Sequence, residues 1–114
     1  MIKGTFKRDA TDKIVAYEIS GHANAGEYGS DIVCAAVSVL VISTANGIDA
    51  LAKIQPIIDV DNEAGGYFYL EMPTELTAEQ DKVAQILLEN LWLGLQAVQE
   101  ENSKYIQIET LSKS

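Results

Sequence analysis

The sequence contains a single cysteine, Cys34, and a single histidine, His22, and these are its clearest candidates for chemistry. A thiolate is a strong nucleophile, and a neighbouring imidazole can take the thiol proton and later protonate a leaving amine. The chain between the two residues contains Gly26 and Gly29, so it can turn back and bring both side chains to one edge of the domain. The pair therefore predicts a cysteine nucleophile assisted by a histidine.

Each of these residues also has a structural explanation when it is taken alone. Cys34 sits among isoleucine, valine and alanine, and free cysteine is among the most buried residue types. A single histidine at the end of a strand is often structural or simply exposed. On the spacing alone, a buried structural thiol and a catalytic thiol both remain open.

Other kinds of site find little support in the sequence. Asp59, Asp61 and Glu63 alternate as in a calcium loop, but Ala64 and Leu70 stand where the glycine and the bidentate glutamate are required. We interpret these acids as the solvent face of a strand. One cysteine and one histidine do not complete a structural zinc site, and no phosphate-binding or dinucleotide-binding motif occurs. We expect neither a metal nor a cofactor.

The elements that position the pair follow from the periodicity of apolar residues. Alternation predicts two strands, over residues 2–7 and 13–20, which form a hairpin. The almost wholly apolar stretch from Asp31 to Lys53 predicts a central helix, with Ser30 or Asp31 as its cap. His22 then lies at a strand end, and Cys34 lies about one turn into a helix, where unpaired N–H groups favour a thiolate.

The second half of the chain repeats the pattern of two strands and a helix. Strands are predicted over residues 56–61 and 67–72, followed by a helix from the capping-box pair Thr77 and Gln80 to about Glu101. A last strand is predicted over residues 105–111. The order ββαββαβ indicates one α+β domain over residues 1–114, with two helices packed on a mostly antiparallel sheet. The central helix is apolar on nearly every side, so a second helix or a partner chain must help the sheet to cover it.

The net charge of the chain limits the kinds of molecule that it is expected to bind. The net charge is -9, and ten acidic residues against one basic residue lie between Ile54 and Glu101. Such a surface repels a phosphate backbone, so we expect no nucleic-acid partner. It attracts a basic protein, or it is simply a solvated surface. We see no signal peptide and no transmembrane segment, and therefore expect a cytoplasmic protein with a reduced thiol.

Residues 21–38 carry a longer pattern that includes the pair. It reads Gly21-His22-Ala23, a loop, and then Gly-Ser-Asp-Ile-Val-Cys-Ala-Ala-Val-Ser from Gly29 to Ser38. These two stretches resemble the signature of the bacterial ribosomal-processing cysteine protease family, Prp. The chain length and the element order also match that family throughout. The resemblance implies a cysteine endopeptidase that removes the N-terminal extension of a large-subunit ribosomal protein, after a hydrophobic segment that contains aromatic residues. It also implies a homodimer.

The resemblance makes His22 and Cys34 the catalytic dyad, with backbone N–H groups near Cys34 holding the oxyanion. Asp31 is the best candidate to orient His22, and Ser38, one turn after Cys34, is a second supporting candidate. Asp31 can equally cap the helix, and Ser38 can bond back to the helix backbone. The loop is expected to be shaped by the substrate, and its candidate contact residues are Gly21, Ala23, Gly26, Tyr28 and Gly29.

Two other functions fit parts of the sequence. An acidic, dimeric, non-enzymatic module would bind a basic ribosomal or ribosome-assembly protein through charge alone, and its binding would survive loss of Cys34. Another thiol enzyme, such as an acyl transferase, or a redox sensor could use the same pair. Only a protease would shorten the N-terminus of a basic precursor.

Overall fold

The computed structural model of the protein describes residues 1–21, 28–61 and 66–112, except for the side chains of residues 28–31. Within these ranges the predicted ββαββαβ order is confirmed. The elements are β1 (Ile2–Arg8), β2 (Ile14–Ser20), α1 (Tyr28–Ala52), β3 (Ile57–Asp61), β4 (Tyr67–Glu71), α2 (Ala78–Glu101) and β5 (Ile106–Ser112).

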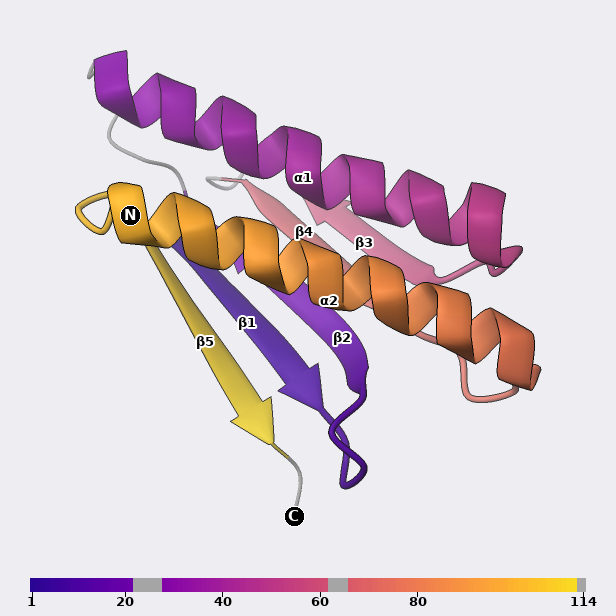
Figure 1. Ribbon diagram of the computed structural model, residues 1–114. Helices are drawn as coiled ribbons and strands as arrows, with labels where there is room; N and C mark the ends of the chain where they lie inside the picture. Colours follow the sequence, from indigo (N-terminus) through magenta and orange to yellow (C-terminus); the bar gives the residue numbers. More distant parts are fainter. Residues whose placement is uncertain (22–27, 62–65, 113–114) are drawn as a thin grey trace.

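The five strands form one sheet in the order β3-β4-β2-β1-β5. Every neighbouring pair is antiparallel except β1 and β5, which are parallel. Both helices lie on the same face of this sheet (Figure 1). The predicted α+β class, with two helices on a mostly antiparallel sheet, is therefore confirmed.

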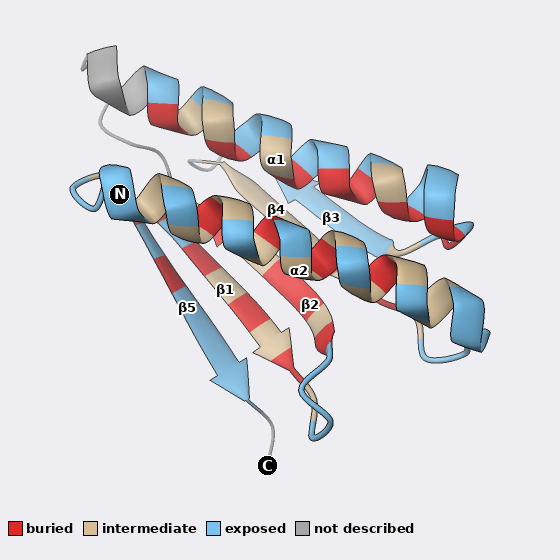
Figure 2. Ribbon diagram, viewed as in Figure 1, coloured by how far each residue is buried: buried red, intermediate tan, exposed pale blue. Residues whose placement is uncertain are grey.

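The core fills the space between the helices and the sheet. Strand residues alternate between this face and the opposite one, and buried residues recur along the helix sides that face the sheet (Figure 2). Phe6 and Tyr17 stack with ring centroids 5.8 Å apart, and the Trp92 ring meets Phe6 edge-on at 5.2 Å. The largest fully buried side chains are Tyr17, Phe6, Ile14, Ile48, Leu70, Leu88, Leu91, Leu95, Ile106 and Val33.

The start of α2 follows the sequence prediction. The Gln80 N–H donates to the Thr77 hydroxyl at 3.1 Å, and the Thr77 N–H donates to the Gln80 side-chain oxygen at 2.9 Å. This reciprocal pair satisfies two of the amides that a helix N-terminus leaves unpaired. The capping box is confirmed, and it fixes where α2 begins.

The start of α1 differs from the sequence prediction. The helix begins at Tyr28, three residues before Asp31, so Ser30 and Asp31 lie inside its first turn. Capping of the helix by either residue was therefore a wrong expectation. Gly29 favours a loop, but one glycine costs a helix only about 1 kcal/mol. The packing of a helix of 25 residues outweighs that cost.

The long apolar helix α1 is held to the sheet by packing and by one buried hydrogen bond. The Tyr17 hydroxyl donates to the Val41 carbonyl at 3.0 Å, and burial raises the pKa of Tyr17, so this donor stays protonated. By length and composition, Ile32–Ala52 is also able to cross a membrane. That is weak evidence for a span, because a core helix passes the same test.

Two glycines lie where α1 and α2 contact each other. Leu87 of α2 packs over Gly47, and Leu40 of α1 packs over Gly94. A Cβ built at Gly94 would lie 3.4 Å from the Leu40 side chain, which is an ordinary contact distance. Gly94 thus marks a helix–helix contact.

Arg8, the last residue of β1, links α2 to the half of the sheet that is farther from β3. Its guanidinium donates two hydrogen bonds to the Glu89 carboxylate, one of them 3.0 Å from Nη2 to Oε1. It also lies 5.6 Å from the centre of the Trp92 ring. The Arg8 side chain is 11% exposed and that of Glu89 is 43% exposed. The bidentate bond lowers the pKa of Glu89 below its ordinary value of 4.5.

Replacing Glu89 with glutamine should lower the free energy of unfolding by about 1 kcal/mol near neutral pH, because Arg8 would lose a charged partner that is itself partly solvated. A carboxylate with a lowered folded-state pKa stabilises the fold above its unfolded pKa. That contribution disappears as the pH falls through the folded-state pKa. Urea unfolding of both proteins over a pH series measures the difference.

The exposed Glu75 provides the control, because Glu75→Gln changes the same charge without a buried partner. We expect its unfolding free energy to match the unmodified protein at every pH. A Glu89→Gln difference that stays constant down to pH values well below 4.5 would contradict the assigned role of the ion pair.

Candidate active site

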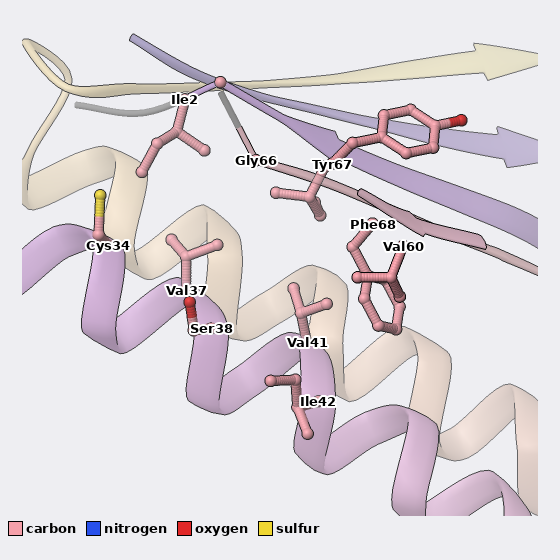
Figure 3. Close-up of a pocket in the computed structure, with 12 residues that line it drawn as sticks. Ile2, Cys34, Val37, Ser38, Val41, Ile42, Val60, Gly66, Tyr67 and Phe68 are labelled. Carbon is pink, nitrogen blue, oxygen red and sulfur yellow. The ribbon is translucent and has the colours of Figure 1, made fainter. Parts of the chain in front are cut away.

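A groove of about 280 Å³ runs between α1 and the strands (Figure 3). The side chains of Val60 and Phe68 point from the sheet toward α1, whereas the Tyr67 ring points away. The groove carries no charged side chain among its described lining residues. These are Ile2, Ile19, Gly21, Cys34, Val37, Ser38, Val41, Ile42, Val60, Gly66, Tyr67 and Phe68.

Cys34 stands at one end of this groove, with its sulfur directed toward the strands near Ile2 (Figure 3). The thiol residue is half-buried and unbonded to another cysteine. Cys34 packs against the edge of the core and also faces open space. It therefore has features of both alternatives that the sequence left open, the buried structural thiol and the accessible catalytic thiol. A thiol in this position is reachable by a molecule that enters the groove.

The position of Cys34 within α1 corrects the expectation that unpaired N–H groups at the helix start favour its thiolate. Because the helix begins at Tyr28, Cys34 is nearly two turns, about 9 Å, from its start. The N–H groups that lack intrahelical partners belong to the first four residues, and the influence of the helix dipole fades within the first turn. The N–H groups of the residues beside Cys34 in the chain are part of the helix ladder, so a backbone donor to the oxyanion would have to come from another segment near Cys34, and that role stays a prediction.

Ser38 lines the same groove one turn after Cys34 and is exposed. The sequence prediction that both residues share a face of α1 is thus confirmed. Thr44, farther along the helix, bonds back to the Leu40 carbonyl at 2.8 Å. Asp31 belongs to the first turn of α1, and its side chain lies outside the described residues.

The remaining predicted site residues divide into three groups. His22, Ala23 and Gly26 lie outside the residues that the structure describes. Tyr28 and Gly29 open α1 instead of belonging to a loop. Gly21 lines the groove together with Cys34, so the structure brings the residue directly before His22 to the thiol's groove.

The apolar walls of the groove were missed in the sequence. On α1 they continue from Cys34 at helical spacing, through Val37, Val41 and Ile42. That signal was present, but it also fits a helix facing the core. Val60 comes from a strand far away in the sequence, and no spacing rule links it to Cys34.

The length and lining of the groove suit an extended, apolar stretch of peptide. Residues 34 to 42 of α1 cover about 12 Å along the helix axis, which is the length of three to four extended residues. Apolar walls favour apolar side chains, since burying them releases water from both surfaces. A nucleophilic thiol at the end of such a groove is an arrangement for acyl transfer from a peptide.

Comparison with known proteins agrees with this chemistry. The family model for the cysteine protease Prp matches residues 1–107. The chain belongs to the Prp family of cysteine proteases. As a member of this family it is an enzyme, a thiol-dependent peptide hydrolase.

Similar proteins and solved structures cover nearly the whole chain. The ribosomal processing cysteine protease Prp of Bacillus subtilis is 36% identical over 110 residues, 96% of this chain and 97% of that protein. SMU.848 of Streptococcus mutans has a TM-score of 0.89 and 33% identity, covering 99% of this chain and 96% of the other.

The essential ribosomal processing protease Prp of Staphylococcus aureus is solved with a substrate peptide and with a covalently linked product peptide. The substrate complex has a TM-score of 0.84 and 29% identity, and covers 97% of this chain and 100% of that one. The product complex gives 0.83 and 30%, with the same coverage. The fold that carries the groove is therefore shared with peptide-binding members of the family.

Because Cys34 faces the groove, iodoacetamide should alkylate it in the folded protein at a rate within about tenfold of the unfolded chain. A core thiol would instead react only through unfolding, about a thousandfold or more slowly. Mass spectrometry of samples quenched over time, with and without urea, gives both rates. Alkylation that occurs only in urea would contradict the placement of Cys34 at an accessible groove.

Proposed function

We propose that Cys34 and His22 form the catalytic dyad of a protease that removes the N-terminal extension of a large-subunit ribosomal protein. The observation that carries the proposal is the position of the Cys34 thiol at the end of an apolar groove, with Gly21, the neighbour of His22, lining the same groove. The names of the relatives and the covalently linked product peptide in one of them support a covalent mechanism on a ribosomal substrate.

In this mechanism the Cys34 thiolate attacks the carbonyl carbon of the scissile bond, and the carbonyl π electrons move to its oxygen. The tetrahedral intermediate collapses as the C–N bond breaks, and the His22 imidazolium protonates the leaving amine. His22 then takes a proton from water, which attacks the thioester. The acid product leaves, and Cys34 is released as the thiolate.

Ser38 is the described side chain best placed to assist this chemistry. Its hydroxyl lies one turn from the thiol in the groove, where it can donate a hydrogen bond to the oxygen that becomes negative. It takes over the role that the helix N–H groups cannot fill. Asp31 is retained as the proposed orienting partner of His22.

The substrate proposal follows from the groove and the charge. An apolar, partly aromatic segment on the acyl side of the scissile bond would lie along Val37, Val41 and Phe68. A ribosomal precursor is basic, and a net charge of -9 accelerates its encounter with the enzyme. We propose the cytoplasm as the site of action, where the single thiol stays reduced.

We also propose that the protein works as a homodimer that buries the exposed apolar surface at the end of the groove away from Cys34. This surface comprises Ile42 of α1, 51% exposed, and Ile58 and Val60 of β3, 46% and 49% exposed. β3 is an edge strand whose five residues are all exposed. A second copy is the occupant we favour, because the resemblance implies a homodimer and the same patch continues into the groove wall at Ile42 and Val60.

Cys34→Ala and His22→Ala should each abolish cleavage of a peptide that carries the ribosomal extension, because nucleophile and proton donor are both required. Ser38→Ala should lower kcat about tenfold to a hundredfold, since one oxyanion donor is lost. Ser43, also exposed on α1 but outside the groove, is the matched control, and Ser43→Ala should cleave normally. Mass spectrometry of the products measures each rate.

Unimpaired cleavage by folded Cys34→Ala or His22→Ala would rule out the dyad. If the unmodified protein binds the precursor with strong salt dependence but never shortens it, the acidic binding module becomes the better account of the function. Transfer of the extension from the Cys34 thioester to an added amine in place of water would indicate an acyl transferase.

Ile42→Asp should convert the dimer to a monomer, because it places a carboxylate in an apolar contact at the proposed interface. Ile86 is an isoleucine on α2 that is 61% exposed, so Ile86→Asp introduces the same charge away from this surface. Sedimentation velocity should show a monomer for the first variant and a dimer for the second. A monomer for the unmodified protein, or equal behaviour of the two variants, would refute this interface.

A further inference from the structure

The face of the sheet that points away from the helices has no covering layer among the described residues, since both helices lie on the other face (Figure 1). The strand register places one row of side chains directly across three strands of this uncovered face. The row consists of Asp59 of β3, Tyr69 of β4 and Glu18 of β2. Asp59 is exposed and the other two are half-buried, so a partner molecule can reach all three.

The part of this face over β3, β4 and β2 carries charge of one sign, and we call it the acidic face. Its acidic residues are Glu18, Asp59, Asp61 and Glu71, and it also carries Tyr67 and Tyr69. These three strands contain no lysine, arginine or histidine. Strands two apart in a sheet are separated by about 10 Å, which is close to the Debye length at about 0.1 M salt. The carboxylates therefore add their fields together over the acidic face.

The two tyrosines hold carboxylates of the acidic face in place. The Tyr69 hydroxyl donates to the Glu71 carboxylate, and the hydrogen bond from Tyr67 to Glu18 raises the pKa of Tyr67. Each carboxylate keeps further lone pairs that can accept from a cation. Because these acceptors are already ordered, a partner that binds them costs little additional side-chain entropy. The acidic face is thus preorganised for ammonium and guanidinium groups.

Lys7 of β1 shows how a cation sits on a tyrosine ring of this face. Its ammonium nitrogen lies 5.5 Å from the centre of the Tyr69 ring, within the range of a cation–π contact. The residue of β2 opposite Lys7 is Ala16, whose short side chain leaves room for the lysine to reach across. The acidic face therefore offers a basic side chain two kinds of contact, a carboxylate and an aromatic ring.

We propose that the acidic face docks a lysine- and arginine-rich segment of the protein substrate, outside the stretch that binds in the groove. The proposal rests on the proposed function, because a ribosomal precursor supplies such a segment. Charge complementarity selects a basic chain as the occupant. A second copy meeting this face with the same face would bring like charges together. Tyr67 lines the groove while its ring points away from it (Figure 3), so the groove and the acidic face adjoin there.

The experiment removes two charges from the acidic face in the double variant Glu18→Gln/Asp59→Asn. The matched control is Glu100→Gln/Glu101→Gln, which removes two charges from exposed positions at the end of α2. Both variants lose the same net charge, so the long-range attraction of a basic substrate weakens equally and only the local contacts differ. For each protein, kcat and KM are measured on the full basic precursor and on a short peptide that carries only the extension and the cleavage site.

For the precursor, we expect the KM of Glu18→Gln/Asp59→Asn to rise about fivefold at low salt with kcat unchanged, because two exposed charge contacts are lost. The control should differ from the unmodified protein by less than about twofold, and added salt should remove the difference between the variants. On the short peptide all three proteins should have the same KM. An equal rise in both variants, or a rise that also appears with the short peptide, would overturn the proposal.

A binding measurement on the unmodified protein separates this proposal from the proposed function. An octalysine peptide, titrated into the ¹⁵N-labelled protein, should shift the amide resonances of Glu18, Asp59 and Tyr69 in the NMR spectrum. If neither the precursor nor the short peptide is cleaved but these resonances shift, the proposed function fails and the docking of a basic segment stands. If the precursor is cleaved and octalysine shifts only other resonances, the proposed function stands and the docking face falls. Sedimentation as a monomer by Glu18→Gln/Asp59→Asn, with a dimer for the unmodified protein, would assign the face to a second copy and overturn the proposal.

Discussion

The position of α1 over the sheet depends on the buried hydroxyl of Tyr17. This side chain is fully buried, stacks on Phe6 and lies beside Phe68, and its hydroxyl has a partner only because the Val41 carbonyl stands 3.0 Å away. A buried hydroxyl without a partner costs several kcal/mol. Together with the close packing of the buried side chains of α1, this bond holds Val41 at one place above β2. The groove, with Cys34 two turns before Val41, takes its shape from that placement.

The groove exists because α1 is close to α2 on one side and is left uncovered on the other. Where the helices meet, Leu87 of α2 packs over Gly47 and Leu40 of α1 packs over Gly94. Two helices on a five-stranded sheet then leave the β3 edge without a third covering layer. The open side of α1 carries Cys34, Ser38 and Ile42 above the half-exposed Val60. Close packing of the helices and openness of the site are therefore two results of one arrangement.

The sequence predicts those features that depend on local chemistry. The alternation of apolar residues in β1 and β2, the Thr77–Gln80 capping box and the shared face of Cys34 and Ser38 are all found in the structure. The start of α1 is mispredicted because the loop preference of Gly29 is weaker than the packing of a long helix. The groove walls are missed for another reason. They require β4 to lie beside β2, a pairing between distant segments that no local pattern contains.

The exposed edge strand β3 has a consequence for how the protein behaves at high concentration. An apolar strand with a free edge is a template for uncontrolled β-sheet growth, and the run Ile57-Ile58-Asp59-Val60-Asp61 has the composition for it. Its two carboxylates lie on the face away from the helices, in register with Tyr69 and Tyr67. Stacked copies of this strand would bring like charges together at every layer, about 4.8 Å apart. The alternating aspartates thus act as gatekeepers against aggregation while leaving the opposite, apolar face available for a specific contact.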